Sequence, residues 1–285
     1  MNNVMRTFRQ EALPAALVWS SFFIIVGVFV WILGDLLWHG ASLFTWDFLI
    51  SAPRQSGRAG GIGPILVSTG LILTICLAVS LPIGFGAAVL LAEFTSADRI
   101  FGRLVRRSLD VLSGVPSIVF GLFGNALFCK AMGLGFSILS GGLTLACMVL
   151  PLLIRSVEEG FRAVPRDYRL SSAALGLSRT SSLFYLLLPA ATPGLIVGIV
   201  LSVGRAMAET AALIFTSGYV DRMPTSLLDS GRSLSIHIFD LSMNISGGDD
   251  SAYKSALVLV ILLLFINGSA SFMAQRLLRQ RITST

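Results

Sequence analysis

The sequence carries unusually little charge. Only 13% of its 285 residues are charged, whereas 54% are hydrophobic, and soluble domains usually have about 25% charged residues. This shortage excludes an ordinary soluble domain and indicates a chain embedded in lipid. The net charge of +6 does not indicate nucleic-acid binding, because the basic residues stand between apolar runs, where membrane proteins place them.

Residues that build reactive or metal-binding sites are also scarce. The sequence has no GxxxxGK[ST] phosphate-binding loop, which excludes ATP binding by that route. His39 and His237 have no Cys or His at ligand spacing, so we expect no metal site and no bound cofactor. Cys76, Cys129 and Cys147 lie in apolar segments without a CxxC pair, as is typical of small buried side chains. No catalytic cluster can be assembled, and we expect no enzyme activity.

Long apolar runs dominate what is present. A transmembrane helix needs about 20 apolar residues, and residues 71–79 do not alternate in polarity as barrel strands do. The first run is too long for a signal peptide, so we interpret it as an uncleaved span. We therefore predict an all-α integral membrane protein with six transmembrane helices, at roughly 13–37, 62–92, 109–129, 136–154, 187–216 and 255–275.

Basic residues are distributed unevenly between these runs. Most of the 21 Lys and Arg residues fall in connections that share one side of the membrane if the number of spans is even. Cytoplasmic connections are enriched in Lys and Arg. This asymmetry predicts that both termini lie in the cytoplasm.

The connection at 155–186, cytoplasmic in this topology, contains a short predicted helix. Pro165 suits the first turn of a helix, Gly176 suits its end, and Asp167 lies near the start, where the helix dipole favours an anion. A short helix held parallel to the membrane can act as a lever against a soluble partner. The alternative is an interfacial amphipathic helix without a partner.

Two charged residues, Arg205 and Glu209, interrupt the fifth run. A charge near the middle of a membrane costs about 2.5–3.5 kcal/mol on insertion scales. Because these residues are four apart, they can share a helix face and pair with each other. They are either a structural ion pair or a substrate contact on a polar path. Arginine offers planar bidentate donors that match the oxygens of an oxyanion such as phosphate.

Proline interrupts two other runs. Pro116 follows Gly114 and removes a backbone donor, which predicts a kink or a break. The small residues around it serve either close helix packing or a broken-helix element in which exposed amides or Ser117 line a path. Pro82 and the glycines after it are open to the same two interpretations.

The loop resembles the permease loop of bacterial ABC importers, which reads E-A-A-x-x-x-G-x9-I-x-L-P. This chain keeps Gly176 and the tail formed by Leu186, Leu188 and Pro189, but has Leu170-Ser171-Ser172 in place of Glu-Ala-Ala. Three further segments, Pro64 to Phe94, Gly114 to Gly124 and Gly204 to Thr216, resemble the PstA-type permeases of phosphate importers.

The resemblance implies a bundle like that of ABC type I importer permeases, with a cytoplasmic coupling helix. Residues 1–61 then hold the N-terminal tail, the first transmembrane helix and an external loop, and residues 62–285 form a permease core of five transmembrane helices. The implied location is the bacterial inner membrane, which the chain crosses several times. The implied partners are a homologous second permease subunit, two cytoplasmic ATPase subunits that bind the ATP, and an external phosphate-binding protein.

The resemblance also assigns roles to residues. It implies translocation of inorganic phosphate by alternating access, along a path that includes Arg205, Glu209, Ser117 and Thr210. Contact with the ATPase is expected from Asp167, Leu170, Ser171, Ser172, Gly176, Leu186, Leu188 and Pro189.

Other functions remain open at this stage. One alternative is a permease for another oxyanion, such as sulfate, molybdate or tungstate. Another is an ion-coupled secondary carrier or a channel, which has no need of the loop motif. A membrane-bound enzyme or sensor is disfavoured, because the chain has neither a catalytic cluster nor a soluble signalling domain.

Overall fold

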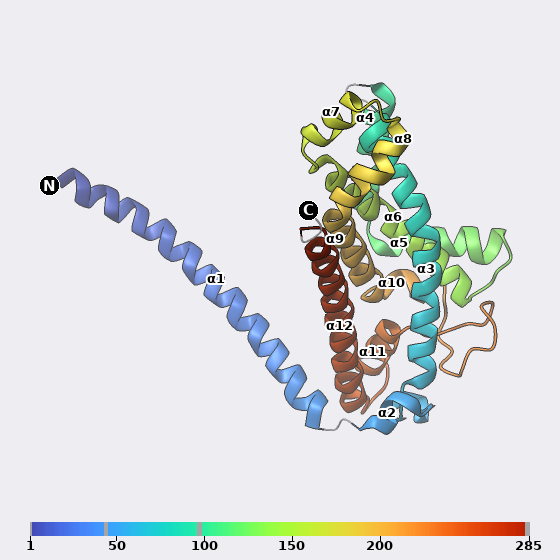
Figure 1. Cartoon of the computed structure of the whole chain (residues 1–285). Helices are drawn as coiled ribbons and strands as arrows, with labels where there is room; N and C mark the ends of the chain where they lie inside the picture. The colour runs from blue at the N-terminus through green and yellow to red at the C-terminus, as the bar shows by residue number, and fades with distance from the viewer. Residues whose placement is uncertain (1, 43–44, 96–98, 283–285) are drawn as a thin grey trace.

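The chain folds almost entirely into helices (Figure 1), in a computed structural model that describes residues 2–42, 45–95 and 99–282. Five helices are long and apolar enough to cross a membrane, which confirms the all-α membrane prediction. They are α1 (Asn2–Ser42), α3 (Gly63–Val89), α6 (Ile138–Arg162), α9 (Leu188–Met207, extended back to Arg179 by α8 and a π-helical turn) and α12 (Asp249–Ile282). A sixth span is formed if the bent pair α4–α5 is counted as one.

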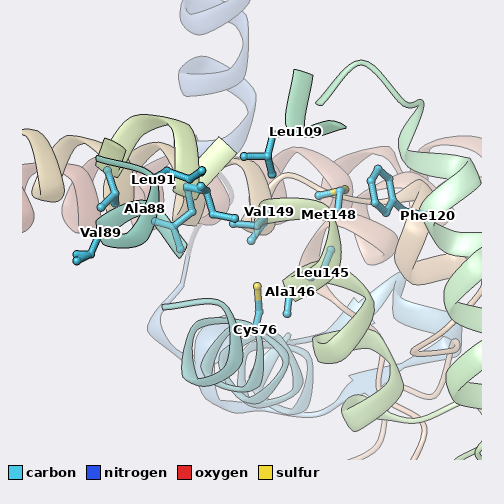
Figure 2. Packing of buried hydrophobic residues seen from close by; sticks show 14 of the residues in the cluster. Cys76, Ala88, Val89, Leu91, Leu109, Phe120, Leu145, Ala146, Met148 and Val149 are labelled. Atoms are coloured by element: carbon cyan, nitrogen blue, oxygen red, sulfur yellow. The ribbon is translucent and has the colours of Figure 1, made fainter. Parts of the chain in front are cut away.

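The core of the bundle lies where α6 packs between α3 and α9. Figure 2 shows part of this buried cluster, and its labelled side chains come from α3, the π-helical turn that follows it (Leu90–Phe94), α4, α5 and α6. Small residues bring the helices close together. A Cβ atom on Gly84 of α3 would lie 2.7 Å from Leu153, and one on Gly142 of α6 would lie 2.6 Å from Ile75. Close approach at small residues is the usual way in which helices associate in lipid.

A close approach of two backbones joins α6 and α9. A Cβ atom on Gly194 would lie 2.5 Å from the Cα atom of Gly160, and a backbone atom cannot move aside as a side-chain tip can. We expect Gly194→Ala to lower the free energy of unfolding by about 1–3 kcal/mol, the usual cost of overpacking. Thermal unfolding of the detergent-purified chain measures this. Gly86→Ala on α3, which meets no atom within 4 Å, is the control, and equal stability of the two variants would contradict the prediction.

The two predicted proline effects have different outcomes. α4 (Ile100–Ser113) and α5 (Ser117–Gly124, continued by a π-helix to Ala131) are bent by 100° at Pro116, which confirms the interruption there. α3 instead continues through Pro82 without a break. Close packing at Gly84 is therefore the interpretation that the structure supports around Pro82.

The first helix stands apart from the bundle. Figure 1 shows α1 running away from the other helices, and no residue is buried in the most apolar stretch of its span. Among the side chains described for residues 15–42, contact with α12 is made near the C-terminal end, where Gly40 packs on Leu257 and the Tyr253 hydroxyl donates to Asp35 at 2.9 Å. A second protein surface or lipid must cover the rest, because about 20 apolar residues are unfavourable in water.

Short elements close the end of the bundle opposite α7. They are α2 (Trp46–Ile50), the antiparallel strands β1 (Pro53–Arg54) and β2 (Ala59–Gly60) with the turn η1 (Gln55–Gly57) between them, and α11 (Leu234–Met243). The segment before α11 is held by Arg232, which donates to the Tyr219 carbonyl at 2.9 Å and pairs with Asp240 at 3.3 Å. His237, beside this pair, is fully buried.

Burial, and next the positive charge of Arg232, lower the pKa of His237 from 6.5 to about 4. The unfolded chain takes up this proton near pH 6.5, so the free energy of unfolding falls as the pH drops from about 6.5 to about 4, by up to about 3 kcal/mol. We expect His237→Gln to be less sensitive to acid over this range in thermal unfolding. The exposed His39→Gln is the control. An acid sensitivity unchanged by His237→Gln would contradict the assignment.

Candidate functional site

Arg205 lies in the last turn of α9, deep along the bundle. α6 and α9 run antiparallel, with Gly160 against Gly194 and Ser156 against Gly198. Continuing this register places Arg205 opposite Val149, thirteen residues before α6 ends at Arg162. At 1.5 Å per residue this is about 20 Å from that end. The hydrocarbon core is about 30 Å thick, so a core that begins at this end of α6 would have Arg205 near its middle.

The side chain of Arg205 is exposed at this depth. Among the described residues no carboxylate pairs with it. A charge that faced lipid there would carry the full cost of desolvation, so such residues face a protein interior or a water-filled cavity. The face that bears Arg205 is therefore expected to meet another protein surface with polar space between them.

The break between α4 and α5 lies beside Arg205. A small cavity of about 70 Å³ is lined by Arg205 together with Ser113 at the end of α4, and by Leu112, Phe120, Met148 and Leu152. α5 begins at Ser117 after Pro116, and no side chain caps its first turn. The structure thus brings Arg205 to Ser113, which the sequence analysis did not single out, rather than into one cavity with Ser117.

The expectation that Arg205 and Glu209 share a helix face is wrong. The fifth predicted span ends at Met207, nine residues early, and α10 (Ala211–Ile214) follows after a turn. The Glu209 carboxylate instead accepts from the Ala212 N–H at 3.3 Å, and the backbone carbonyl of Glu209 accepts from the Ser235 hydroxyl at 2.6 Å. Glu209 therefore anchors the start of α10. Thr210, half-buried, occupies the position before that helix.

The predicted helix of the loop is present as α7 (Arg166–Ala174), which begins after Pro165 and has Asp167 in its first turn. Gly176 ends it with φ of 69°, a conformation that glycine adopts readily. The Gly176 N–H donates to the Ala173 carbonyl and the Leu177 N–H to the Ser172 carbonyl, both at 3.0 Å. This Schellman arrangement satisfies the last carbonyls of the helix. The end of the helix thus explains why residue 176 is a glycine.

An ion pair fixes α7 to the bundle. The guanidinium of Arg169 contacts the carboxylate of Glu93 at 2.6 Å and 3.2 Å, and also donates to the carbonyls of Val164 and Phe161. Glu93 belongs to the π-helical turn Leu90–Phe94 that ends α3. The pair thus joins α7 to the end of α3. The sequence analysis missed this pair, because the two residues are 76 positions apart.

The other residues expected to contact an ATPase form a first group that is exposed and a second group that is buried or half-buried. Leu170 and Ser171 are exposed on α7, beside the exposed side chains of Tyr168 and Leu175. Ser172 is buried and accepts from the Ser182 hydroxyl at 2.9 Å, which joins α7 to α8 (Arg179–Ser182). The motif's tail is half-buried in the helix that returns to the bundle, and comprises Leu186, Leu188 and Pro189. Only the first group offers a surface to a partner.

A second buried network lies just below α7. Glu158, only 2% exposed, accepts from Arg106 of α4 at 2.7 Å and from Arg162 at 2.9 Å. Arg106 also donates to the Leu91 carbonyl at 2.7 Å. One carboxylate thus holds α4 and α6 together with the end of α3. On the neighbouring turn of α6, Arg155 pairs with Asp110 of α4.

Comparison with known proteins gives consistent results. Residues 80–284 match the family described as binding-protein-dependent transport system inner membrane component. The probable ABC transporter permease protein YqgI of Bacillus subtilis (strain 168) is 30% identical over 265 residues, covering 88% of this chain and 90% of that protein. The phosphate transport system permease protein PstA of Mycobacterium leprae (strain TN) is 32% identical over 254 residues, covering 87% and 83%.

Solved structures share the fold at lower identity. An inward-facing MetNI methionine ABC transporter chain superimposes with a TM-score of 0.58 at 17% identity, covering 76% of this chain and 94% of that one. A chain of a bacterial ABC transporter that imports the acidic polysaccharide alginate gives 0.56 at 15% identity, with 94% and 96% covered.

Proposed function

Because the chain belongs to the family of binding-protein-dependent transport system inner membrane components, we propose that it carries inorganic phosphate through the inner membrane as the permease subunit of an ATP-driven importer. As a permease, the chain is a multi-pass transport component and not an enzyme, and separate ATPase subunits bind and hydrolyse the ATP.

The observation that carries the proposal is Arg205, a charge exposed near the middle of the membrane without a partner carboxylate among the described residues. Its fork of donors matches the oxygens of a tetrahedral anion. Relatives named as phosphate permeases add support. A path that offers one guanidinium beside the polar break at Ser113 and Ser117 binds phosphate weakly, which suits passage.

Partners follow from the exposed surfaces. A homologous second permease subunit would face Arg205 and enclose the path between the two chains. The exposed span of α1 gives that subunit further apolar surface to cover. Two ATPase subunits would contact α7 through Leu170 and Leu175, which are 68% and 75% exposed. An external phosphate-binding protein would deliver the anion to the opposite end, where α2 and α11 lie.

Coupling uses the rigid connection between α7 and α3. The end of the bundle with α7 would be cytoplasmic and so would both termini, in agreement with the distribution of basic residues. When the ATPases close on ATP, α7 would move with them, and the Arg169–Glu93 pair would transmit this movement to α3. Alternating access to Arg205 from the two sides results.

Solute competition tests the choice of phosphate. Cells that lack other phosphate importers and express this chain with its partners are expected to take up radiolabelled phosphate. Excess unlabelled phosphate should abolish this uptake. Excess sulfate, molybdate or tungstate should leave the uptake rate within about twofold of the rate without competitor, which corresponds to a small change in free energy. Inhibition by one of these other oxyanions as strong as that by unlabelled phosphate would contradict selectivity for phosphate, and no phosphate uptake at all would contradict phosphate as the substrate.

A further inference from the structure

A recess lined by arginines lies beside α7, away from Arg205. It has a volume of about 640 Å³ and is bordered by the end of α3, the starts of α4, α7 and α8, and the end of α6. One carboxylate and five guanidinium groups contribute to its lining, from Glu93, Arg99, Arg162, Arg166, Arg169 and Arg179.

Two of the arginines are fixed in place. Arg169 is held by Glu93 and by two backbone carbonyls, and Arg162 is held by Glu158. Both remain partly exposed, at 30% and 48% of the side chain. These guanidinium groups therefore form a prearranged floor that still has donors free to face the recess.

The other three arginines have no acidic partner within the described part of the chain. Arg99, Arg166 and Arg179 are exposed at the rim and form no ion pair with a described residue. Arg166 and Arg169 are three residues apart on α7, so their like charges share a face, which is unfavourable. Positive charge at the start of α4 and α7 also opposes the helix dipole. An anion in the recess would relieve all of these repulsions.

We propose that this recess is a binding site for a phosphate group, distinct from the translocation path. Several oxygens of one phosphate can accept from guanidinium groups on different helices at once, and the recess is large enough to hold the rest of a phosphate ester. The group comes either from free inorganic phosphate or from the headgroup of an anionic lipid, since basic pockets at the ends of transmembrane helices bind such headgroups. Occupancy ties α7 to the starts of α4 and α8, and so stiffens the element that contacts the ATPase.

Two binding measurements on the full chain, purified in a maltoside detergent that contains no phosphate, separate the sources. Equilibrium dialysis with radiolabelled inorganic phosphate tests the free anion, and native mass spectrometry with added phosphatidylglycerol counts retained lipid. The test variant is Arg166→Gln combined with Arg179→Gln, which removes two rim charges and no ion pair of the structure. The control is Arg107→Glu, an equal change of charge at an exposed residue of α4 outside the recess. Thermal unfolding verifies that both variants fold.

The wild type is expected to bind in at least one arm, and the rim variant to bind that probe at least about tenfold more weakly, with the control within about twofold. Binding of phosphate alone identifies free phosphate as the ligand, and binding of the lipid alone identifies a headgroup. No binding in either arm, or binding that the rim variant leaves unchanged, would overturn the proposal. Phosphate binding that Arg205→Ala removes and the rim variant does not would also overturn it while leaving the proposed path intact.

Discussion

Arg205→Ala is expected to lower phosphate uptake by about 100-fold while the protein reaches the membrane at its normal level. A charge-assisted hydrogen bond to an anion contributes about 1.5–3 kcal/mol. Among the described residues that line the small cavity beside the break between α4 and α5, Arg205 is the only cation. Arg205→Lys should give an intermediate rate, because lysine keeps the charge but loses the bidentate fork. The measurement is the initial rate of radiolabelled phosphate uptake in whole cells.

Arg107→Ala is the matched control, since it removes an exposed arginine from α4. Its uptake should remain within about twofold of wild type, because Arg107 is exposed and forms no ion pair with a described residue, and such residues contribute little to stability. Normal uptake by Arg205→Ala, at normal membrane level, would show that Arg205 does not contact the transported anion.

Glu158→Gln should have the largest effect on stability. The substitution keeps the size of the side chain but leaves Arg106, which is 13% exposed, without its carboxylate, and Arg162 loses its partner as well. Removing one member of a buried ion pair costs about 3–5 kcal/mol, and the partial exposure of Arg162 places the expected loss near the lower figure. Thermal unfolding of the purified chain and its level in the membrane should both fall.

The adjacent residue supplies the control for this loss. Glu159 is exposed on the same turn of α6 and forms no ion pair with a described residue, so Glu159→Gln should unfold at the wild-type temperature. If Glu158→Gln and Glu159→Gln unfolded at the same temperature, the ion pairs of Glu158 would contribute nothing to the stability of the fold.

Local signals predicted the parts of the molecule that depend on neighbouring residues. The helix α7 could be located because a proline precedes it and Gly176 ends it with a positive φ. The break at Pro116 was predicted for the same kind of reason, since a missing N–H acts on its own turn. The apolar runs gave the spans because length and polarity are enough to define a membrane helix.

Contacts between distant residues could not be predicted in this way. Apart from Arg205 and Glu209, the run from 187 to 216 carries no charge. Neither residue marks the end of α9 at Met207, where α10 begins to pack against α5 and α6. The pairing of Arg205 with Glu209 failed for that reason. Glu93 and Arg169 meet because the fold brings α7 against the end of α3. The separation of α1 reflects an absence of packing that no periodicity reveals.

The most direct test of the account is phosphate transport into proteoliposomes that contain this chain, the second permease and the ATPase subunits, with the phosphate-binding protein supplied on the side opposite α7. The account predicts uptake of radiolabelled phosphate that requires ATP on the α7 side and is lost with Arg205→Ala in an assembly of normal composition. Phosphate uptake without ATP would indicate a secondary carrier or a channel, and ATP-driven uptake of another oxyanion with none of phosphate would contradict the assignment of the substrate.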